Sequence, residues 1–534
     1  MLTLRPYQSA ANDALLTHWS KGGGNALIEM GTGLGKSVII ADLVRQLITS
    51  YPDLRVLMLV HVRELVAQNL KALLQLYPNA PVGINSAGLG RRDYHQQILF
   101  ASIQSVYKHA VRLGPRDLIV VDECHLMPHD GEGMYRHLLA TLDAPHEMRV
   151  VGYSATAYRL DSGRLDQGQG KLFDKTVFKY GIGEGIEDGW LSPLISKATV
   201  TALDTNGVAK RGGEFVPGAL EIAINKDWIT TAAVNEIAQF GEHRKSWLAF
   251  CCGVKHAHQV AEAIRAKGIS CEAVTGETPK RERDRLISAF KSGQLRCLTN
   301  AQVLTTGFDA PQTDMIAMLR PTLSPGLYVQ ICGRGTRKAE GKQDCLILDF
   351  ARNILRHGPV DTIETGEFKP RVGDGSPLAK ECPHCATLVA LAALRCPTCG
   401  YEWPERAATP KHEATAEASA AILSKGAPAW VAVDSVRYYR HEKEGSPPSL
   451  RAEYDCGLSV HRSWLCFSHQ GFARQKAESW WRRCGGGVVP RDTDEALRRV
   501  AELAQPTSIQ IRPDGKFFSV VNWQFSKEKE EKAA

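Results

Sequence analysis

Several features that would restrict the function are scarce or absent in this 534-residue sequence. No apolar run approaches the roughly 20 residues that a membrane-spanning helix needs, and we find no secretory signal, so we expect no membrane partner. Only 7% of the residues are aromatic, and the net charge of +7 is spread along the chain. Such a charge permits a polyanionic partner without demonstrating one.

Disulfide-type cysteine spacing is also missing. Of 14 cysteines, ten are scattered and four form two C-x-x-C pairs, a pattern that fits a reducing compartment and predicts a cytoplasmic protein. The length exceeds what one core supports and indicates several domains. With 43% apolar and 23% charged residues, the composition is that of a folded globular chain.

A glycine-rich loop follows a short apolar stretch, Ala26–Glu29, and precedes an expected helix. Its backbone N–H groups can point at a phosphate, and the helix start adds positive potential. Lys36 is then expected to reach the β- and γ-phosphates, and Ser37 to offer its hydroxyl to Mg²⁺. Met30 stands where G-x-x-x-x-G-K-[ST] has its first glycine, and a chance glycine-rich turn is the alternative. The predicted nucleotide-binding residues are Gly31, Thr32, Gly33, Leu34, Gly35, Lys36 and Ser37.

Two adjacent acids follow the apolar run Leu118–Val121, which is typical of a buried parallel strand. Ligands of open α/β sheets bind at the carboxyl ends of strands, where Asp122 and Glu123 are expected to lie. One acid can hold Mg²⁺ while the other orients or deprotonates a water molecule. Alone, the pair could be an ordinary strand end. Together with the glycine-rich loop, it predicts a Mg²⁺-dependent nucleoside triphosphatase.

Three stretches resemble motifs I, II and III of superfamily 2 helicases: Gly31–Ser37, Asp122–His125 and Ser154–Thr156. The D-E-C-H spelling resembles the DExH branch. The resemblance implies that Asp122 binds Mg²⁺ and that Glu123 is the catalytic base. It further implies that His125 couples the nucleotide to Ser154 and Thr156, and that Arg5 and Gln8 recognise adenine. The stretch around Arg5 is equally a good helix start, with Pro6 near the first turn.

The second half of the chain carries two further matches. Thr305–Pro311 resembles motif V, and Gln330–Arg337 matches the Q-x-x-G-R-x-x-R of motif VI. Arg334 and Arg337 are three apart, so on a helix they would face one way. Their planar cationic groups suit neutralisation of a transferring γ-phosphoryl group, although solvated surface arginines are the alternative. The resemblance adds Gln330 to the catalytic set and Gly307 and Asp309 to the nucleotide site.

By the same resemblance, a nucleic-acid strand would be held across both lobes by its phosphates. Serine and threonine at strand ends are often helix caps instead. The expected contact residues are His61, Arg63, Ser102, Gln104, Thr275, Thr305 and Thr306.

Two C-x-x-C pairs ten residues apart, Cys382/Cys385 and Cys396/Cys399, predict a zinc ribbon. Each turn can direct two sulfurs at one centre, and four thiolates complete a tetrahedral Zn²⁺ site. A redox pair is the alternative, but a closed four-thiolate site is structural and stabilises a piece too small to fold alone.

The strand–helix alternation predicts an α/β protein with two tandem, doubly wound, parallel-sheet lobes. The resemblance to helicases implies that these lobes are RecA-like. A zinc ribbon and a small α+β carboxyl-terminal domain follow. We interpret Gly181–Gly185, which resembles a dinucleotide loop on paper, as a turn. The predicted ranges are lobe 1 at 1–190, a connector at 191–224, lobe 2 at 225–370, the zinc ribbon at 378–404, a linker at 405–427, the last domain at 428–526 and a disordered tail at 527–534.

The last domain carries cations beside two tryptophans, Trp480 and Trp481. They could contact a nucleic-acid backbone and stack on bases, but a buried tryptophan pair with solvated arginines explains the pattern equally well. The cations are Arg474, Lys476, Arg482 and Arg483.

The domain order, together with the stretches His61–Gln68 and Val303–Pro311, is similar to RadD-type bacterial and phage DNA helicases, most clearly up to about residue 355. This resemblance implies an ATP-dependent DNA helicase or translocase in repair, recombination or replication. Its partners would be single-stranded or branched DNA and a single-strand-binding or repair protein. The alternatives are a restriction-type motor without its nuclease, an RNA helicase, and a nucleic-acid sensor or remodelling scaffold switched by ATP.

Overall fold

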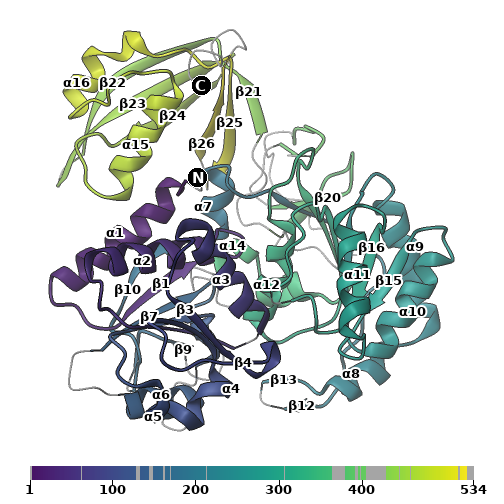
Figure 1. Cartoon of the computed structure of the whole chain (residues 1–534). Coiled ribbons are helices and arrows are strands. Elements are labelled where there is room, and N and C mark those ends of the chain that lie inside the picture. The colour runs from purple at the N-terminus through teal and green to yellow at the C-terminus, as the bar shows by residue number, and fades with distance from the viewer. Residues whose placement is uncertain are drawn as a thin grey trace.

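The structure of the chain is a computed structural model. It describes residues 3–61, 63–127, 133–142, 148–159, 163–168, 170–211, 213–305, 307–363, 379–390, 395–396, 398–403, 422, 429–443, 445–457, 459–514 and 517–525. Two large α/β lobes lie side by side, and the carboxyl-terminal domain sits above lobe 1 in Figure 1. No helix in the described part of the chain is both long and apolar enough to cross a membrane.

Lobe 1 is built on an eight-stranded sheet in the order β10-β1-β7-β6-β2-β5-β3-β4, parallel except for β4. Its central strands are buried on both faces, as the continuous apolar runs predict. The strands are β1 (Ala26–Met30), β2 (Val56–Val60), β3 (Val82–Ser86), β4 (Arg91–Arg92), β5 (Ile98–Ser102), β6 (Leu118–Asp122), β7 (Arg149–Ser154) and β10 (Lys175–Tyr180), with a small hairpin β8 (Tyr158–Arg159) and β9 (Gly163–Arg164). The helices are α1 (Pro6–Ser20), α2 (Lys36–Ser50), α3 (Arg63–Leu76), α4 (Ile103–Val106), α5 (Ala110–Leu113), α6 (Met134–Leu142) and α7 (Ile182–Glu187).

Lobe 2 has a second eight-stranded sheet in the order β15-β16-β14-β17-β18-β11-β20-β19. In this sheet, β20 runs antiparallel to both of its neighbours, β11 and β19. The strands are β11 (Leu194–Lys197), β14 (Trp247–Cys251), β15 (Cys271–Val274), β16 (Cys297–Asn300), β17 (Met315–Leu319), β18 (Cys345–Asp349), β19 (Ala379–Glu381) and β20 (Thr387–Ala390), with a hairpin β12 (Lys210–Arg211) and β13 (Glu214–Phe215). The helices are α8 (Pro217–Ile224), α9 (Asp227–Phe240), α10 (Val254–Arg265), α11 (Lys280–Lys291), α12 (Pro325–Gly335), α13 (Asn353–His357) and α14 (Val360–Ile363).

Two segments join this second sheet from outside the range predicted for lobe 2. Strand β11 lies in the stretch 191–224, predicted as a connector, yet it pairs in parallel with β18. The hairpin β19–β20 carries the first C-x-x-C pair and adds to the free side of β11. The zinc-ribbon hairpin is therefore continuous with the sheet of lobe 2.

The carboxyl-terminal domain is a six-stranded sheet in the order β21-β25-β26-β24-β23-β22. Helix α15 covers one face, and Trp480 and Trp481 are 3% and 0% exposed there, so the buried-pair interpretation is correct. The elements are β21 (Ala429–Ala432), β22 (Ser435–Lys443), β23 (Ser446–Cys456), β24 (Ser459–Leu465), β25 (Ser508–Asp514), β26 (Phe517–Gln524), α15 (Phe472–Arg483) and α16 (Thr493–Arg498). The predicted fold class, two RecA-like lobes with a four-cysteine cluster and a mixed last domain, is confirmed.

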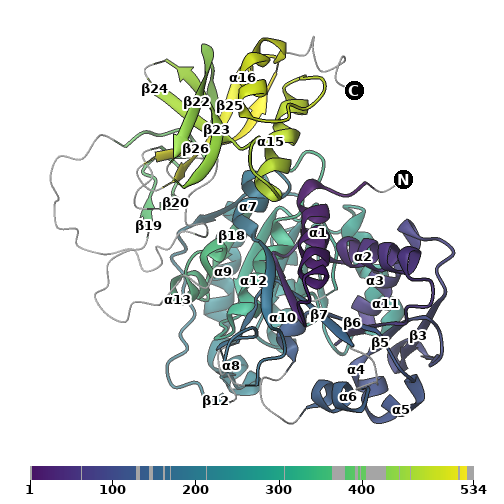
Figure 2. The same ribbon diagram turned by 90° about the vertical axis from the view of Figure 1, so that its left-hand side faces the viewer.

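The turn predicted at Gly181–Gly185 is wrong, because α7 begins there. The Glu184 carboxylate accepts a hydrogen bond of 3.0 Å from the backbone N–H of Gly181, and this bond caps the helix start. Figure 2 shows α7 beneath the carboxyl-terminal domain. Two ion pairs hold the domain there: buried Arg512 binds Glu187, and Lys476 lies 3.0 Å from Asp188.

Candidate active site

The glycine-rich loop joins β1 to α2, as predicted. Gly33 and Gly35 have φ values of +83° and +81°, a backbone region that side chains disfavour. The Lys36 ammonium lies 3.3 Å from the Met30 carbonyl oxygen, to which it donates, and 3.8 Å from Glu123 Oε1. Met30 contributes through its backbone carbonyl while its side chain is buried in the core. This explains why methionine is tolerated at the first position of the loop pattern.

Asp122 ends β6 beside this loop, and Glu123 follows in a left-handed conformation with φ 54°. A non-glycine residue with positive φ is uncommon and marks a site where the fold enforces the backbone. Asn69 of α3 donates a 2.9 Å hydrogen bond to Asp122 Oδ2. Gln68, its neighbour, donates to the Ser37 hydroxyl at 3.2 Å. The two predicted Mg²⁺ ligands, Ser37 and Asp122, are thus oriented by the same helix.

The two acids have different protonation tendencies. Burial and the adjacent Glu123 charge raise the pKa of Asp122. Burial would also raise the pKa of Glu123, but Lys36 and His125 outweigh it and lower that pKa. Glu123 therefore stays ionised at neutral pH, the state needed to accept a hydrogen bond or proton from water. The Lys36 charge also acts on Asp122 but does not offset burial and the Glu123 charge, so a divalent cation would suit this carboxylate.

His125 connects this acidic turn to the end of β7. Its Nδ1 lies 3.3 Å from Glu123 Oε2 and 3.0 Å from Ser154 Oγ. The Ser154 hydroxyl donates to the Thr156 carbonyl at 2.9 Å and accepts from the Thr156 N–H at 3.0 Å. The residues predicted to couple the nucleotide to the sheet are therefore in contact.

The residues predicted to recognise adenine lie against the loop. Gln8 Nε2 donates to the Leu34 carbonyl at 3.0 Å, and the Tyr7 hydroxyl donates to the same oxygen at 2.8 Å. The Tyr7 ring stacks on Tyr180 with centroids 4.4 Å apart. The Arg5 guanidinium lies 5.0 Å over the Trp190 ring. This end of the site is therefore fixed to the loop by backbone contacts that leave Arg5 on a planar surface.

The motif VI arginines approach from lobe 2 but do not share a helix. Helix α12 ends at Gly335, so Arg337 lies beyond it, and the expectation that both arginines are helical is wrong. Both nevertheless donate to the Phe308 carbonyl, and Arg337 also pairs with Asp309. Gly333 packs so closely on Thr32 that a Cβ atom would clash, which places α12 directly on the nucleotide loop. Gln330 lies in α12, and Gly307 directly precedes Phe308, whose carbonyl accepts from both arginines.

Of the residues predicted to contact nucleic acid, the structure places His61 and Gln104 in contact with each other. Gln104 Nε2 donates to the His61 carbonyl at 3.1 Å, so these two lie together at the ends of β2 and β5. Ser102 and Thr275 are buried in local hydrogen bonds of the capping kind. Thr305 is also buried. Thr306 and the side chain of Arg63 lie outside the described residues. These assignments stay predictions.

The four cysteines predicted to hold zinc converge. All their sulfurs lie within 4.8 Å of one another. The Cys382–Cys399 and Cys385–Cys396 sulfur pairs are 3.5 and 3.6 Å apart. A tetrahedral ion with Zn–S bonds of about 2.3 Å has sulfur–sulfur edges of about 3.8 Å. The donor set therefore fits a structural Zn²⁺ ion.

Replacing Cys382 with serine should lower bound zinc from about one ion per chain to near zero, because a closed site needs all four thiolates. Metal analysis of the purified chain measures this change. The matched control is Cys466→Ser, a cysteine outside the cluster, which should keep its zinc. Equal zinc in both variants would contradict the assignment.

Sequence reasoning missed Asn69, Gln68 and Trp190. Asn69 is distant in sequence from Asp122 and sits in an ordinary amphipathic helix, so no local pattern marks it. Gln68 is the last residue of the stretch His61–Gln68 that carries the helicase resemblance, and Asn69 follows it; that stretch was the signal in the sequence that could have pointed to them.

Together, the fold and the site define a two-lobed nucleoside triphosphatase whose active site is shared between the lobes. Two protein-family models match the two lobes. Residues 1–159 match "Type III restriction enzyme, res subunit", and residues 231–339 match "Helicase conserved C-terminal domain". The two lobes are therefore similar to the domains that these two family models describe, one from a restriction-enzyme subunit and one from helicases. Residues 380–405, around the cysteines, match "Uncharacterised protein family UPF0547".

Curated relatives agree with this class. The chain is 30% identical to IRC3 of Saccharomyces cerevisiae, named as a candidate ATP-dependent helicase, over 65% of this chain and 51% of that protein. It is 32% identical to irc3 of Schizosaccharomyces pombe, named as a candidate mitochondrial ATP-dependent helicase, over 66% of this chain and 58% of that protein. The chain thus spans between half and three fifths of these relatives.

One solved structure supports the fold alone. A fragment of a candidate HsdR subunit of a type I restriction enzyme from Vibrio vulnificus YJ016 superposes with a TM-score of 0.51 at 22% identity. The match covers 67% of this chain and 66% of that one.

Proposed function

We propose that this chain hydrolyses ATP to move along or unwind DNA. The observation that carries the proposal is the convergence of Lys36, Glu123 and Arg334 from two lobes on one site. Burial and the adjacent Arg337 lower the pKa of Arg334, whose Nη1 donates to the neutral Phe308 carbonyl. A phosphate oxygen would be a stronger partner for this cation. Closing the lobes on ATP would offer that partner.

The roles of the chain's residues follow from these positions. Lys36 is paired with Glu123 here; once it turns toward the β- and γ-phosphates, Glu123 is released to orient the attacking water. Ser37 and Asp122 would hold Mg²⁺, which screens phosphate charge. Gln8 and Arg5 would contact adenine. Arg334 and Arg337 would neutralise charge that develops on the γ-phosphoryl group.

Movement requires that hydrolysis alter the lobe contact. His125 touches both Glu123 and Ser154, so a change at the acid can reach the end of β7. Gly326, at the start of α12, lies close to Thr156, since a Cβ atom there would be 3.4 Å from the Thr156 hydroxyl. We infer that His125, Ser154 and Thr156 pass the nucleotide state to lobe 2.

Finer assignments stay proposals. The RadD-type resemblance, a role in DNA repair, recombination or replication, a single-strand-binding or repair protein as partner, and a cytoplasmic location rest on sequence alone. The relatives include a protein named as mitochondrial and a restriction-enzyme subunit of similar fold. A restriction-type motor, an RNA helicase and an ATP-switched scaffold therefore remain the alternatives.

One experiment separates these functions. We expect ATP hydrolysis by the full chain to be stimulated by single-stranded DNA more than by duplex DNA or RNA, and a forked DNA duplex to be separated. Phosphate release and strand displacement measure the two activities. An absence of stimulation by any DNA would contradict the proposal; stimulation by RNA alone would indicate an RNA helicase. Stimulation without displacement would indicate a translocase or a switched scaffold.

A further inference from the structure

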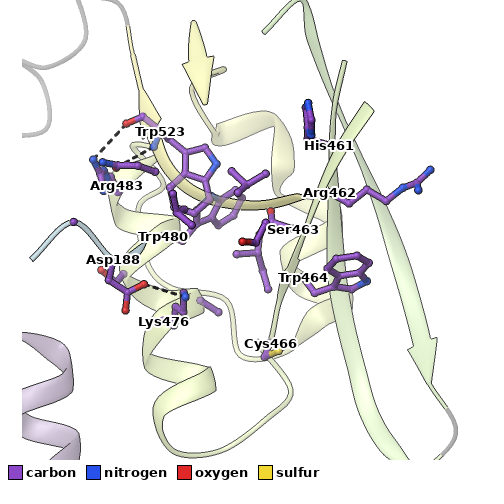
Figure 3. Close-up of a pocket in the computed structure, with 18 of the residues that line it drawn as sticks. Asp188, His461, Arg462, Ser463, Trp464, Cys466, Lys476, Trp480, Arg483 and Trp523 are labelled. Carbon is purple, nitrogen blue, oxygen red and sulfur yellow. Dashed lines mark hydrogen bonds and ion pairs between the residues drawn. The ribbon is translucent and has the colours of Figure 1, made fainter. Parts of the chain in front are cut away.

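A crevice of about 1410 Å³ lies between the carboxyl-terminal domain and both lobes. Strands β24 and β26 form its upper walls; they pair in parallel only at Arg462 and Ser519. Helix α15 forms the floor, and Tyr7, Trp190 and Lys338 close the end that faces the lobes. Figure 3 shows Asp188 and Lys476 on one side of the crevice and Arg462 and Trp464 on the other.

Positively charged side chains outnumber negatively charged ones in the lining of this crevice. Its lining holds five cations and one acid, Asp188, which lies 3.0 Å from Lys476. Glu453, outside the lining, lies 2.7 Å from Arg462 and 3.3 Å from Arg451, so Lys338 and Arg483 are the lining cations without an acidic partner among these pairs. Burial and the proximity of Arg483 and Arg5 lower the pKa of Lys338. Lys338, Arg483 and Arg5 therefore repel one another, and an anion beside Lys338 and Arg483 would relieve this repulsion. The cations are Lys338, Arg451, Arg462, Lys476 and Arg483.

Aromatic side chains continue the crevice onto the open face of the sheet, opposite α15. Tyr439 of β22, Arg451 of β23 and Trp464 of β24 are in register across three strands. Tyr439 and Trp464 are 37% and 50% exposed, unusual for rings of this size in a folded domain. The Arg451 guanidinium lies 5.1 Å over the Tyr439 ring. The row therefore presents planar surfaces beside cations.

We propose that this crevice and the adjoining aromatic row form a binding site for single-stranded nucleic acid. A base would stack on Trp464, and the sugar-phosphate backbone would run past Arg462 toward Arg483 and Lys338. Exposed rings flanked by spaced cations are what sequence-independent binding of a single strand requires. The inference deepens the proposed function, since it rests on a nucleic-acid substrate.

An acidic peptide is the competing occupant, and two features favour the nucleic acid. The cations are distributed from the sheet to lobe 2 and do not form one cluster. Such spacing suits the regularly spaced phosphates of a nucleic-acid backbone. Trp464, the more exposed ring of the row, makes a T-shaped contact with His441, with ring centroids 6.0 Å apart, and half of its surface is left for a planar group. A peptide side chain would use a pocket in preference to a flat face.

Binding and crosslinking of oligothymidylate to the full-length chain test this site. Trp464→Ala should raise the Kd about 5- to 150-fold, the range measured for loss of a stacked base, whereas Trp464→Tyr should bind nearly as the natural chain does. Arg462→Gln should reduce the slope of log affinity against log salt by about 0.7, as expected for one lost phosphate contact on a single strand. Oligonucleotides with 5-iododeoxyuridine should crosslink to β24 peptides.

The matched control is Arg498→Gln, an exposed arginine of α16 in the same domain that does not line the crevice; affinity and salt slope should not change. Crosslinks confined to the lobes, with normal affinity in Trp464→Ala, would overturn the inference. So would a Trp464-dependent complex with a polyglutamate peptide but not with the oligonucleotide. If oligothymidylate fails to stimulate ATP hydrolysis yet still crosslinks to Trp464, the proposed function fails while this site stands.

Discussion

Replacing Arg334 with alanine is expected to lower kcat for ATP hydrolysis about 10³- to 10⁵-fold, the range found when such an arginine is missing from comparable triphosphatases. Arg334 is buried at the lobe interface, and its charge acts on Glu123. Its loss would remove charge neutralisation at the stage of γ-phosphoryl transfer and leave most contacts to bound ATP intact. Single-turnover hydrolysis together with binding of a fluorescent ATP analogue separates the two effects.

Arg334→Lys and Arg498→Ala serve as controls. A lysine keeps the charge but loses the planar fork, so it should recover only part of the rate. The exposed Arg498 should have no effect. A kcat for Arg334→Ala within tenfold of the natural chain would contradict the role. A fall in analogue binding alone would assign Arg334 to binding.

Replacing Glu123 with glutamine should leave ATP binding nearly unchanged and reduce turnover about 10²- to 10⁴-fold, the usual contribution of a general base. The amide keeps the shape of the side chain but cannot take a proton from water. Removing the charge also removes the acidic partner of Lys36. We therefore expect ATP to bind equally well or somewhat more tightly, which calorimetry measures.

The matched control for charge removal is Glu340→Gln, an exposed acid after motif VI. Its turnover should equal that of the natural chain. Near-normal hydrolysis by Glu123→Gln would refute the base assignment. Loss of binding would assign Glu123 to holding the nucleotide loop through Lys36.

The sequence revealed those parts of the site that are contiguous along the chain. Lys36 and the acids Asp122 and Glu123 follow apolar strands, and strand order at a parallel sheet's carboxyl edge then brings them together. Asn69 could not be found this way, because its contact with Asp122 depends on how α3 packs on β6. Spacing alone also misjudged Arg337, since α12 ends two residues earlier.

Packing between segments that are distant in sequence was the second feature that could not be predicted from the sequence. Strand β11 is only four residues long and lies in a stretch of weak pattern, so nothing local shows that it pairs with β18. Helix α7 is glycine-rich and disfavoured by propensity. It forms because Glu184 caps it and because Gly185, without a side chain, admits Leu34 and Leu191.

The place of the zinc-ribbon hairpin has a consequence for solubility. Strand β11 would be the outer strand of the lobe 2 sheet if β20 did not pair with it. Unpaired outer strands recruit strands of other molecules, and short, charged edges prevent this. The hairpin replaces the edge of β11 with the three-residue β19, which carries Lys380 and Glu381. Metal release would therefore uncover a ready site for aggregation at the edge of the motor itself.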